Sequence, residues 1–266
     1  MAQTWNQGLA YELGQCMGQE YKDANNYGWY GPAMNTHRSA FAGRNFEYYS
    51  EDGVLAGEIA ANQVNGAAEH GVYAYIKHFA LNDQEINRTS MLMTFSSEQA
   101  IREIYLKPFE IATKKFEGTS RAVMSSFNWI GTMPSCANSN LLNNVLRGEW
   151  GFVGMVESDY DGSYGYMITD HCIRNGNDLM LGFGSAESNI LADQSATAVQ
   201  AMRQACKNIL YTVGNSGYYT VDKDPAGVMT NMTKIFITVD VIVALIIIAI
   251  EAIVILRYMK KKKAAE

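Results

Sequence analysis

The chain has no excess of basic residues. It carries 21 Lys and Arg against 27 Asp and Glu, a formal net charge of -6. Proteins that bind nucleic acid through its phosphates usually carry a basic surface, so this composition argues against nucleic acid as a partner. A small neutral or cationic ligand fits the charge balance better. The 48% of hydrophobic residues is that of an ordinary globular protein with one large domain or two small ones.

Cysteine is also scarce, and the N-terminus lacks a targeting pattern. Cys16, Cys136, Cys172 and Cys206 lie far apart and match no metal-ligand spacing. We therefore expect free, buried thiols and neither a metal nor another cofactor. The first residues show no basic region followed by an apolar core, so no secretory signal peptide is expected among them.

A long apolar run, residues 235–256, lies near the C-terminus. Its 22 residues would span about 33 Å as a helix, against a hydrocarbon core of about 30 Å. A basic stretch, residues 257–266, follows it. Because basic flanks tend to stay in the cytoplasm, this pattern places the tail inside and residues 1–230 outside. The sequence thus predicts a single-pass protein of the cell membrane that contacts lipid through the apolar run.

This topology needs a signal ahead of the exported part, and the sequence shows none. We therefore expect the chain to be the C-terminal piece of a longer protein. Residues 215–234 are polar and without periodicity. They are interpreted as a linker between a soluble domain, residues 1–214, and the membrane helix.

Two acids, Asp240 and Glu251, lie inside the apolar run. They are eleven residues apart, which at about 100° per residue returns to nearly the same helix face. Acids within a membrane suggest a partner helix or an ion path. Alternatively, because each lies within two turns of an end, both side chains reach the interface. The sequence leaves both interpretations open.

The soluble part alternates between helical and extended patterns. Hydrophobic periodicity predicts helices at residues 5–21, 53–70, 97–117, 139–148, 163–174 and 188–213. Strands are predicted at residues 72–81, 121–130, 153–160 and 178–184, and a strand followed by a loop is predicted at residues 28–37. Strands that alternate with helices favour a parallel sheet built from βα units.

The polar residues distinguish between two parallel folds. Each predicted strand ends in polar or glycine-rich residues, which is typical of a barrel whose βα loops meet at one mouth. A doubly wound sheet would concentrate them at one switch point, and no dinucleotide fingerprint follows the first strand. Five strands do not close an eight-stranded barrel. The predicted fold class is therefore α/β, an incomplete TIM-type (β/α) barrel with a C-terminal transmembrane helix.

Basic residues near two strand ends are candidates for ligand binding. Arg44 could form forked hydrogen bonds to vicinal hydroxyls, hold a carboxylate, or form a salt bridge within its loop. Lys77 and His78 are neighbours, and neighbours on a strand face opposite sides. Both reach one pocket only if the strand ends there; otherwise one of them packs under a helix.

The segment GMVESDYDG, residues 154–162, carries three carboxylates. Strand alternation places Glu157 and Asp159 on one face, with Asp159 at the mouth and Glu157 one step deeper. A buried carboxylate must be paired or neutral, so we expect a basic partner for Glu157. Asp161 is expected at a turn or on the rim.

Six motifs follow one another along the chain, and the resemblance that they carry covers most of residues 1–220. They are GRNFEYYSEDGVLAG, KHFALNDQE, REIYLKPFE, VMSSFNWIG, LRGEWGFVGMVESDY and NDLMLG. Together they resemble glycoside hydrolase family 3, the β-glucosidase group, in the C-terminal part of its catalytic barrel. Any one motif alone would be weak, whereas the ordered set is specific.

The resemblance implies a retaining glycosidase that releases terminal, non-reducing β-D-glucosyl or related residues through a covalent glycosyl-aspartate. The nucleophile of the family falls on Asp159. Its sugar-binding positions fall on Arg44, Lys77, His78, Met124, Phe127 and Tyr160. The expected substrates are β-linked oligosaccharides or aryl β-glucosides. Such an enzyme needs an ionised carboxylate and a second carboxyl about 5 Å away.

The sequence also departs from the family pattern. Phe127 replaces a Tyr near the nucleophile, Tyr160 replaces a common Trp, and Glu157 stands where an apolar residue is usual. The first barrel strand, with a sugar-binding Asp, and the sandwich domain that usually supplies the acid are missing. We therefore expect impaired activity and a missing N-terminal sandwich domain as a partner.

Two further functions remain open. One is a non-catalytic, membrane-anchored protein that binds carbohydrate or takes part in an assembly. The other is a β-N-acetylhexosaminidase or β-xylosidase of the same family, because contacts with the terminal sugar do not fix its substituents.

Overall fold

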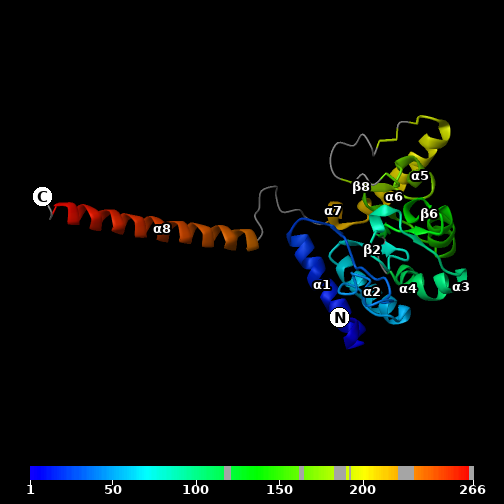
Figure 1. The fold of residues 1–266 in the computed structure, drawn as a ribbon, viewed down its shortest axis with the longest axis horizontal. Coiled ribbons are helices and arrows are strands. Elements are labelled where there is room, and N and C mark those ends of the chain that lie inside the picture. The colour runs from blue at the N-terminus through cyan, green and yellow to red at the C-terminus, as the bar shows by residue number, and fades with distance from the viewer. Residues whose placement is uncertain (117–120, 162–164, 183–189, 192, 221–230, 264–266) are drawn as a thin grey trace. The chain divides into compact units, whose positions relative to one another are not determined.

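The structure is a computed structural model that contains two compact units, Met1–Asp222 and Lys223–Glu266 (Figure 1). Each unit is considered by itself. The residues that the structure describes are 1–116, 121–161, 165–182, 190, 191, 193–220 and 231–263.

A curled parallel sheet of five strands forms the centre of the first unit (Figure 1). All neighbouring strands in the order β1-β2-β4-β7-β8 run parallel. The strands are β1 (Gly28–Trp29), β2 (Tyr73–Phe79), β4 (Ala122–Ser125), β7 (Met155–Asp161) and β8 (Leu179–Gly182). This half-barrel confirms the α/β class and the parallel sheet expected from the alternating pattern.

Helices connect the strands and cover the outer face of the sheet. They are α1 (Gln7–Asp23), α2 (Gly53–Ala68), α3 (Glu98–Ala100), η3 (Ile101–Tyr105), α4 (Lys107–Lys115), η5 (Asn140–Glu149), α5 (Thr169–Arg174), α6 (Ala196–Gly214) and α7 (Gly217–Thr220). Asp52 begins α2, where its carboxylate accepts a hydrogen bond from the N–H of Val54. A cap of this kind satisfies an amide that has no partner within the helix.

Helices α1 and α2 pack unusually closely. A Cβ atom on Gly14 would lie 2.0 Å from the carbonyl oxygen of Gln63, and one on Gly66 would lie 2.2 Å from that of Tyr11. Only glycine permits this approach of two backbones. The contact fixes the helix that precedes β1 against the helix that precedes β2.

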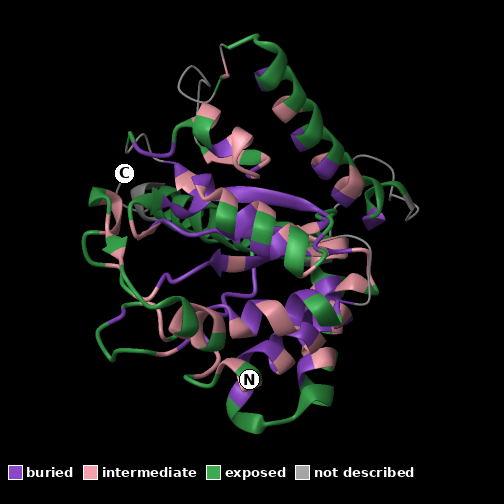
Figure 2. Ribbon diagram, turned by 90° about the vertical axis from the view of Figure 1, so that its right-hand side faces the viewer, coloured by how far each residue is buried: buried purple, intermediate pink, exposed green. Residues whose placement is uncertain are grey.

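The main hydrophobic core lies between the sheet and its helices. It includes Ile76 and Phe79 of β2, Phe109 of α4 and Leu142 and Leu146 of η5, all of them fully buried. Figure 2 shows buried residues on the strands and on the helix faces that meet them. Removing this much apolar surface from water is the main stabilisation of the unit. It holds the strands whose carboxyl ends carry the candidate site.

One predicted strand is divided between two sheets. Residues 121–130 give β4 in the main sheet and β5 (Trp129–Ile130) in a small second sheet. There β5 pairs with β3 (Met93–Thr94) and, across a turn at Gly131, with β6 (Met133–Pro134). This small sheet was not predicted, because pairs of two residues leave no alternating pattern.

Other element boundaries also differ from prediction. Helix α6 begins only after Ser195, whose hydroxyl accepts from the N–H of Ala198. The helix predicted at 163–174 begins only at α5 (Thr169–Arg174), because residues 165–168 are not helical; residues 162–164 lie outside the described residues. The expected linker, 215–234, begins too early, because α7 belongs to the first unit: the N–H of Gly217 donates to the carbonyl of Gly71 at 2.8 Å.

The cysteines are all free thiols. The expectation of burial is correct for Cys136 and Cys172 and wrong for Cys16 and Cys206, which are exposed. Cys16 lies on α1 and Cys206 on α6, both on helix faces directed toward solvent.

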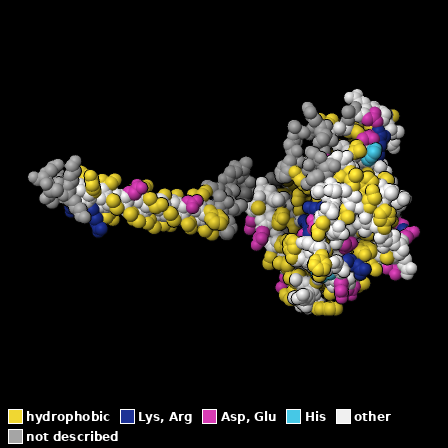
Figure 3. Space-filling view, in the orientation of Figure 1, with side chains coloured by type: hydrophobic (Ala, Val, Ile, Leu, Met, Phe, Trp, Pro, Cys, Tyr) yellow, Lys and Arg dark blue, Asp and Glu magenta, His cyan; other side chains and the backbone are white. Residues whose placement is uncertain are grey.

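The second unit contains one long helix, α8 (Asn231–Lys263). Its segment Lys234–Lys260 contains a run of 18 residues with a mean hydropathy of 3.0 and is long and apolar enough to cross a membrane, by length and composition alone. Figure 3 shows hydrophobic side chains along the helix, interrupted by acidic ones. Those acids, Asp240 and Glu251, are exposed on the isolated helix, so their role stays open.

Candidate active site

A cavity of about 580 Å³ lies at the carboxyl ends of the strands. All seven residues that the sequence singled out line it: Arg44, Lys77, His78, Met124, Phe127, Asp159 and Tyr160. The remaining lining residues are Tyr30, Gly43, Phe46, Glu47, Glu85, Arg88 and Leu181. Parallel strands bring their carboxyl ends to one edge, which is why segments so distant in sequence meet here.

Asp159 contributes its carboxylate to the lining of this cavity. It is 6% exposed, and its Oδ1 accepts a hydrogen bond from the N–H of Tyr160 at 2.7 Å. Its Oδ2 has no hydrogen-bond partner among the described residues and lies 3.9 Å from Nε2 of His78. Burial raises the pKa of Asp159 to about 6, and the Tyr160 amide and the nearby cations oppose this rise. Asp159 is therefore ionised at neutral pH.

Arg44 and Lys77 form a chain of charges with Glu47. The Nε of Arg44 donates to Glu47, and Nζ of Lys77 lies 3.9 Å from the other oxygen of that carboxylate. The loop salt bridge that the sequence left open for Arg44 is therefore present, and Arg44 lines the cavity as well. Burial lowers the pKa of Lys77, while Glu47 and Asp159 act in the opposite direction.

His78 is fixed by its backbone and is buried at 1% exposure. Its N–H donates to Oδ1 of Asn35 at 2.8 Å, and the Asn35 amide donates back to its carbonyl at 2.9 Å. Burial, with Arg44 and Lys77 nearby, lowers its pKa well below the ordinary value, so the imidazole is neutral. Lys77 and His78 both line the cavity, and the peptide bond between them is cis.

Two charged residues of the site were not predicted, Glu85 and Arg88. Arg88 makes an ion pair with Glu85 at 3.0 Å, and its guanidinium carbon lies 4.1 Å from the centre of the Phe127 ring. The face of an aromatic ring attracts such a cation. Glu85 is the last residue of the motif KHFALNDQE, but neither residue was singled out, because a spacing of three residues between an acid and a base is not distinctive.

Glu157 differs from expectation in its partner. It is 2% exposed, and its Oε1 accepts a hydrogen bond from the hydroxyl of Tyr30 at 3.1 Å, so the expected basic partner is wrong. Oε2 has no partner among the described residues. Burial, with a smaller contribution from the charge of Asp159, raises its pKa to about 7, although the hydrogen bond from Tyr30 acts in the opposite direction. Glu157 is thus neutral below about pH 7, and a neutral form is the other outcome allowed to a buried acid.

The expectation for Asp161 is also wrong. This residue is the last of β7 and is 8% exposed, rather than lying on a rim or turn. It pairs with Gly182 of β8, so the strand continues two residues beyond Asp159. The end of the strand was placed too early, and its register with β8 shifts between Glu157 and Tyr160, so that both Asp159 and Tyr160 line the cavity.

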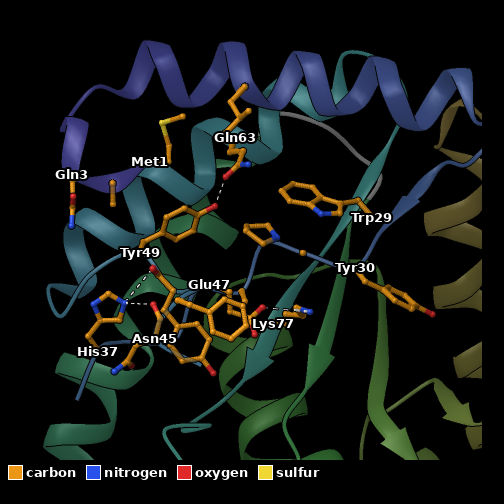
Figure 4. A pocket seen from close by; sticks show the side chains of 17 residues that line it. Met1, Gln3, Trp29, Tyr30, His37, Asn45, Glu47, Tyr49, Gln63 and Lys77 are labelled. Atoms are coloured by element: carbon orange, nitrogen blue, oxygen red, sulfur yellow. Dashed lines mark hydrogen bonds and ion pairs between the residues drawn. The ribbon is translucent and has the colours of Figure 1, made fainter. Parts of the chain in front are cut away.

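A second cavity, of about 590 Å³, adjoins the first (Figure 4). The two share Tyr30, Phe46, Glu47 and Lys77 as lining residues. Figure 4 shows the rings of Trp29 and Tyr49 around it, with the hydroxyl of Tyr49 directed at Gln63. Aromatic walls beside polar groups are suited to a sugar ring, which has an apolar face and polar edges.

No group of three or more His, Cys, Asp or Glu side chains in the described part of the chain is arranged to hold a metal ion.

Comparison with known proteins identifies the family. Residues 1–205 match the family model of the glycosyl hydrolase family 3 N-terminal domain. The chain belongs to glycosyl hydrolase family 3. Beta-glucosidase A of Butyrivibrio fibrisolvens is 44% identical over 187 residues, 70% of this chain and 22% of that protein. Beta-glucosidase B of Emericella nidulans is 42% identical over 163 residues, 61% of this chain and 19% of that protein.

Solved structures of this family share the fold. Beta-glucosidase 3B from Thermotoga neapolitana, in complex with glucose, gives a TM-score of 0.72 at 38% identity, over 82% of this chain and 31% of that one. Beta-glucosidase from Kluyveromyces marxianus in complex with glucose gives a TM-score of 0.73 at 29% sequence identity. The match covers 88% of this chain and 28% of that one. This family 3 chain thus spans about a fifth of the length of the curated relatives and under a third of the length of the chains in these structures.

Proposed function

We propose that this family 3 chain is the catalytic part of a retaining β-glycosidase that releases terminal β-D-glucosyl residues, with Asp159 as nucleophile. One observation carries the proposal. Asp159 faces a cavity large enough for a sugar, with one carboxylate oxygen held by the Tyr160 amide and the other without a hydrogen-bond partner. Family membership and the glucosidases among its relatives support the same reaction.

In this mechanism Oδ2 of Asp159 attacks the anomeric carbon of the bound sugar. A C–O bond to Asp159 forms, the glycosidic C–O bond breaks, and the leaving oxygen departs with the electron pair and takes up a proton. Water then attacks the same carbon, loses one proton to solvent to become the hydroxyl of the released sugar, and leaves Asp159 as a carboxylate. Arg44, Lys77 and the neutral His78 supply hydrogen-bond donors that orient the hydroxyls of the sugar.

The proton for the leaving group needs a second carboxyl. Glu47 and Glu85 line the same cavity, but Arg44 donates to Glu47 and Arg88 pairs with Glu85. Neither is therefore a suitable proton donor in this arrangement. We accordingly propose that this chain cleaves aryl β-glucosides with good leaving groups, which need little proton donation, and is impaired with oligosaccharides.

Hydrolysis of an activated aryl β-glucoside tests the proposal. The full chain should release the phenol. Asp159→Asn should release it at least about a thousandfold more slowly, because the nucleophile is removed. Glu157→Gln is the matched control, since it changes an acid on the same strand face one step deeper, and it should retain most of the activity. Unchanged activity in Asp159→Asn would refute Asp159 as the nucleophile, and a full chain that releases no phenol would refute the enzymatic proposal and favour a binding role.

We also propose that α8 anchors the protein in the cell membrane, with the first unit outside and the C-terminus in the cytoplasm. The support is the apolar segment Lys234–Lys260 and the basic residues at its C-terminal end. A membrane-impermeant maleimide should label the exposed Cys16 in intact cells, and a cysteine introduced as Ala264→Cys should react only after lysis. The reverse pattern, or a protein that stays soluble, would overturn this topology.

A further inference from the structure

Two buried cysteines meet beside the wall of the candidate site. Cys136 lies in η4 (Ser135–Ala137) and Cys172 in α5; their sulfur atoms are 3.4 Å apart and both side chains are 0% exposed. We propose that Cys136 and Cys172 form a disulfide when the protein is made in an oxidising compartment. Cys16 and Cys206 are exposed and lie on other helices, so they take no part.

The geometry requires little movement for this bond. A disulfide has a sulfur–sulfur distance of about 2.05 Å, so the two sulfur atoms must approach by just over an ångström. Helices α5 and η4 are already in contact, and the Cys172 thiol is directed at the Cys136 sulfur. Rotation of the two side chains can close this distance without separating the helices.

The environment suits a bond better than two thiols. The pair lies in an apolar cluster with Phe127, Tyr166 and Met167. The hydrogen bond with Cys136, together with burial, raises the pKa of Cys172 far above its usual range. A thiol that does not ionise is a poor nucleophile. The bond therefore forms while the chain folds and the thiols are still accessible, and it is inert once buried.

The step balances with a small disulfide, such as oxidised glutathione, as the oxidant. The thiolate of one cysteine attacks a sulfur of the oxidant, and one small thiolate leaves and takes up a proton. The thiolate of the second cysteine then attacks the protein sulfur of the mixed disulfide and releases the second small thiol. Two protein thiols are oxidised, and one small disulfide is reduced to two thiols.

The bond would close a ring of chain that contains the catalytic strand. Residues 136–172 include β7 and therefore Asp159. The same cluster contacts Phe127 and Tyr160, which line the cavity. A disulfide here would tie η4 to α5 beside Phe127 and Tyr160. The inference does not depend on the glycosidase activity, and it agrees with the outside location proposed for this unit.

Peptide mapping tests the pairing directly. The full chain is refolded with oxidised glutathione, its free thiols are blocked, and it is digested with trypsin. Cleavage after Arg121, Arg147 and Arg174 places Cys136 and Cys172 on separate peptides, 122–147 and 148–174. The expected result is a single linked pair of these two peptides, with Cys16 and Cys206 blocked. Four blocked cysteines, or another pairing, would overturn the proposal.

Thermal unfolding with and without reductant provides the second measurement. Closing a ring of this length should raise Tm by about 8–15 °C in a domain of this size. The variant Cys16→Ala/Cys206→Ala keeps the pair and should show the full shift, and Cys136→Ala/Cys172→Ala should show none. If the second variant does not fold, the first still decides, because equal Tm values in both conditions would refute the bond.

Discussion

Replacing Glu157 by glutamine should stabilise the protein at alkaline pH and leave it nearly unchanged at acidic pH. The pKa of Glu157 is raised from 4.5 to about 7, chiefly by burial. Each unit between folded and unfolded pKa corresponds to about 1.4 kcal/mol, so the ionised side chain costs the folded protein about 3 kcal/mol. Glutamine keeps an oxygen that can accept the Tyr30 hydroxyl and cannot ionise.

The direction of the effect follows from which state holds the proton. Below about pH 4.5 both states hold it, and no stability is lost. Between about pH 4.5 and 7 the unfolded chain releases its proton first, so the free energy of unfolding falls as pH rises. Above the folded pKa of about 7 the loss is complete. The gain from glutamine should therefore appear across this window and reach its full size near pH 8.

Urea unfolding of the full chain at pH 5 and pH 8 measures this difference. Glu12→Gln, on the exposed face of α1, is the matched control and should behave like the unaltered protein at both pH values. The reasoning is refuted if Glu157→Gln is less stable than the unaltered protein at pH 8. It is also refuted if the difference between the two proteins is the same at both pH values.

Two further predictions follow from the geometry. Arg88 lowers the pKa of Asp159, which is about 6, so kcat/KM for an activated aryl glucoside should rise with pH through about 6. Arg88→Met should move that rise to higher pH, whereas Arg38→Met should not; a rise that stays in place in Arg88→Met would contradict the assignment. Gly14→Ala should cost about 1–3 kcal/mol in urea unfolding, because its Cβ would lie 2.0 Å from the Gln63 carbonyl. Gly214→Ala, with nothing within 4 Å of the added Cβ, is its control, and equal stability of the two variants would show that α1 and α2 can separate.

The parallel sheet could be predicted because its strands are long enough to show a pattern. Strand β2 was expected at 72–81 and runs Tyr73–Phe79, and α2 was expected at 53–70 and ends at Ala68. Once the strands were known to be parallel, the meeting of Lys77 and Asp159 at one edge followed from topology. The position of the site at this edge of the sheet could therefore be predicted without knowing how the side chains pack.

The contacts that were not predicted depend on packing between distant segments. Glu157 takes its partner from Tyr30, 127 residues away, and no local pattern favours a tyrosine over a basic residue. Cys136 and Cys172 come together only because η4 packs on α5. Arg88 begins a single 3-10 turn, η2 (Arg88–Ser90), which is too short to leave a periodic pattern in the sequence. Each of these requires the fold to be known first.

The central claim is that Asp159 forms a bond to the sugar, and trapping that bond tests it most directly. An activated 2-deoxy-2-fluoro β-glucoside slows the release of the sugar from the enzyme more than its transfer, so the intermediate accumulates. Peptide mass spectrometry of the treated full chain should find one glycosyl group, on Asp159. A glycosyl group on Glu157 or another acid, or a chain that remains unlabelled, would contradict the account.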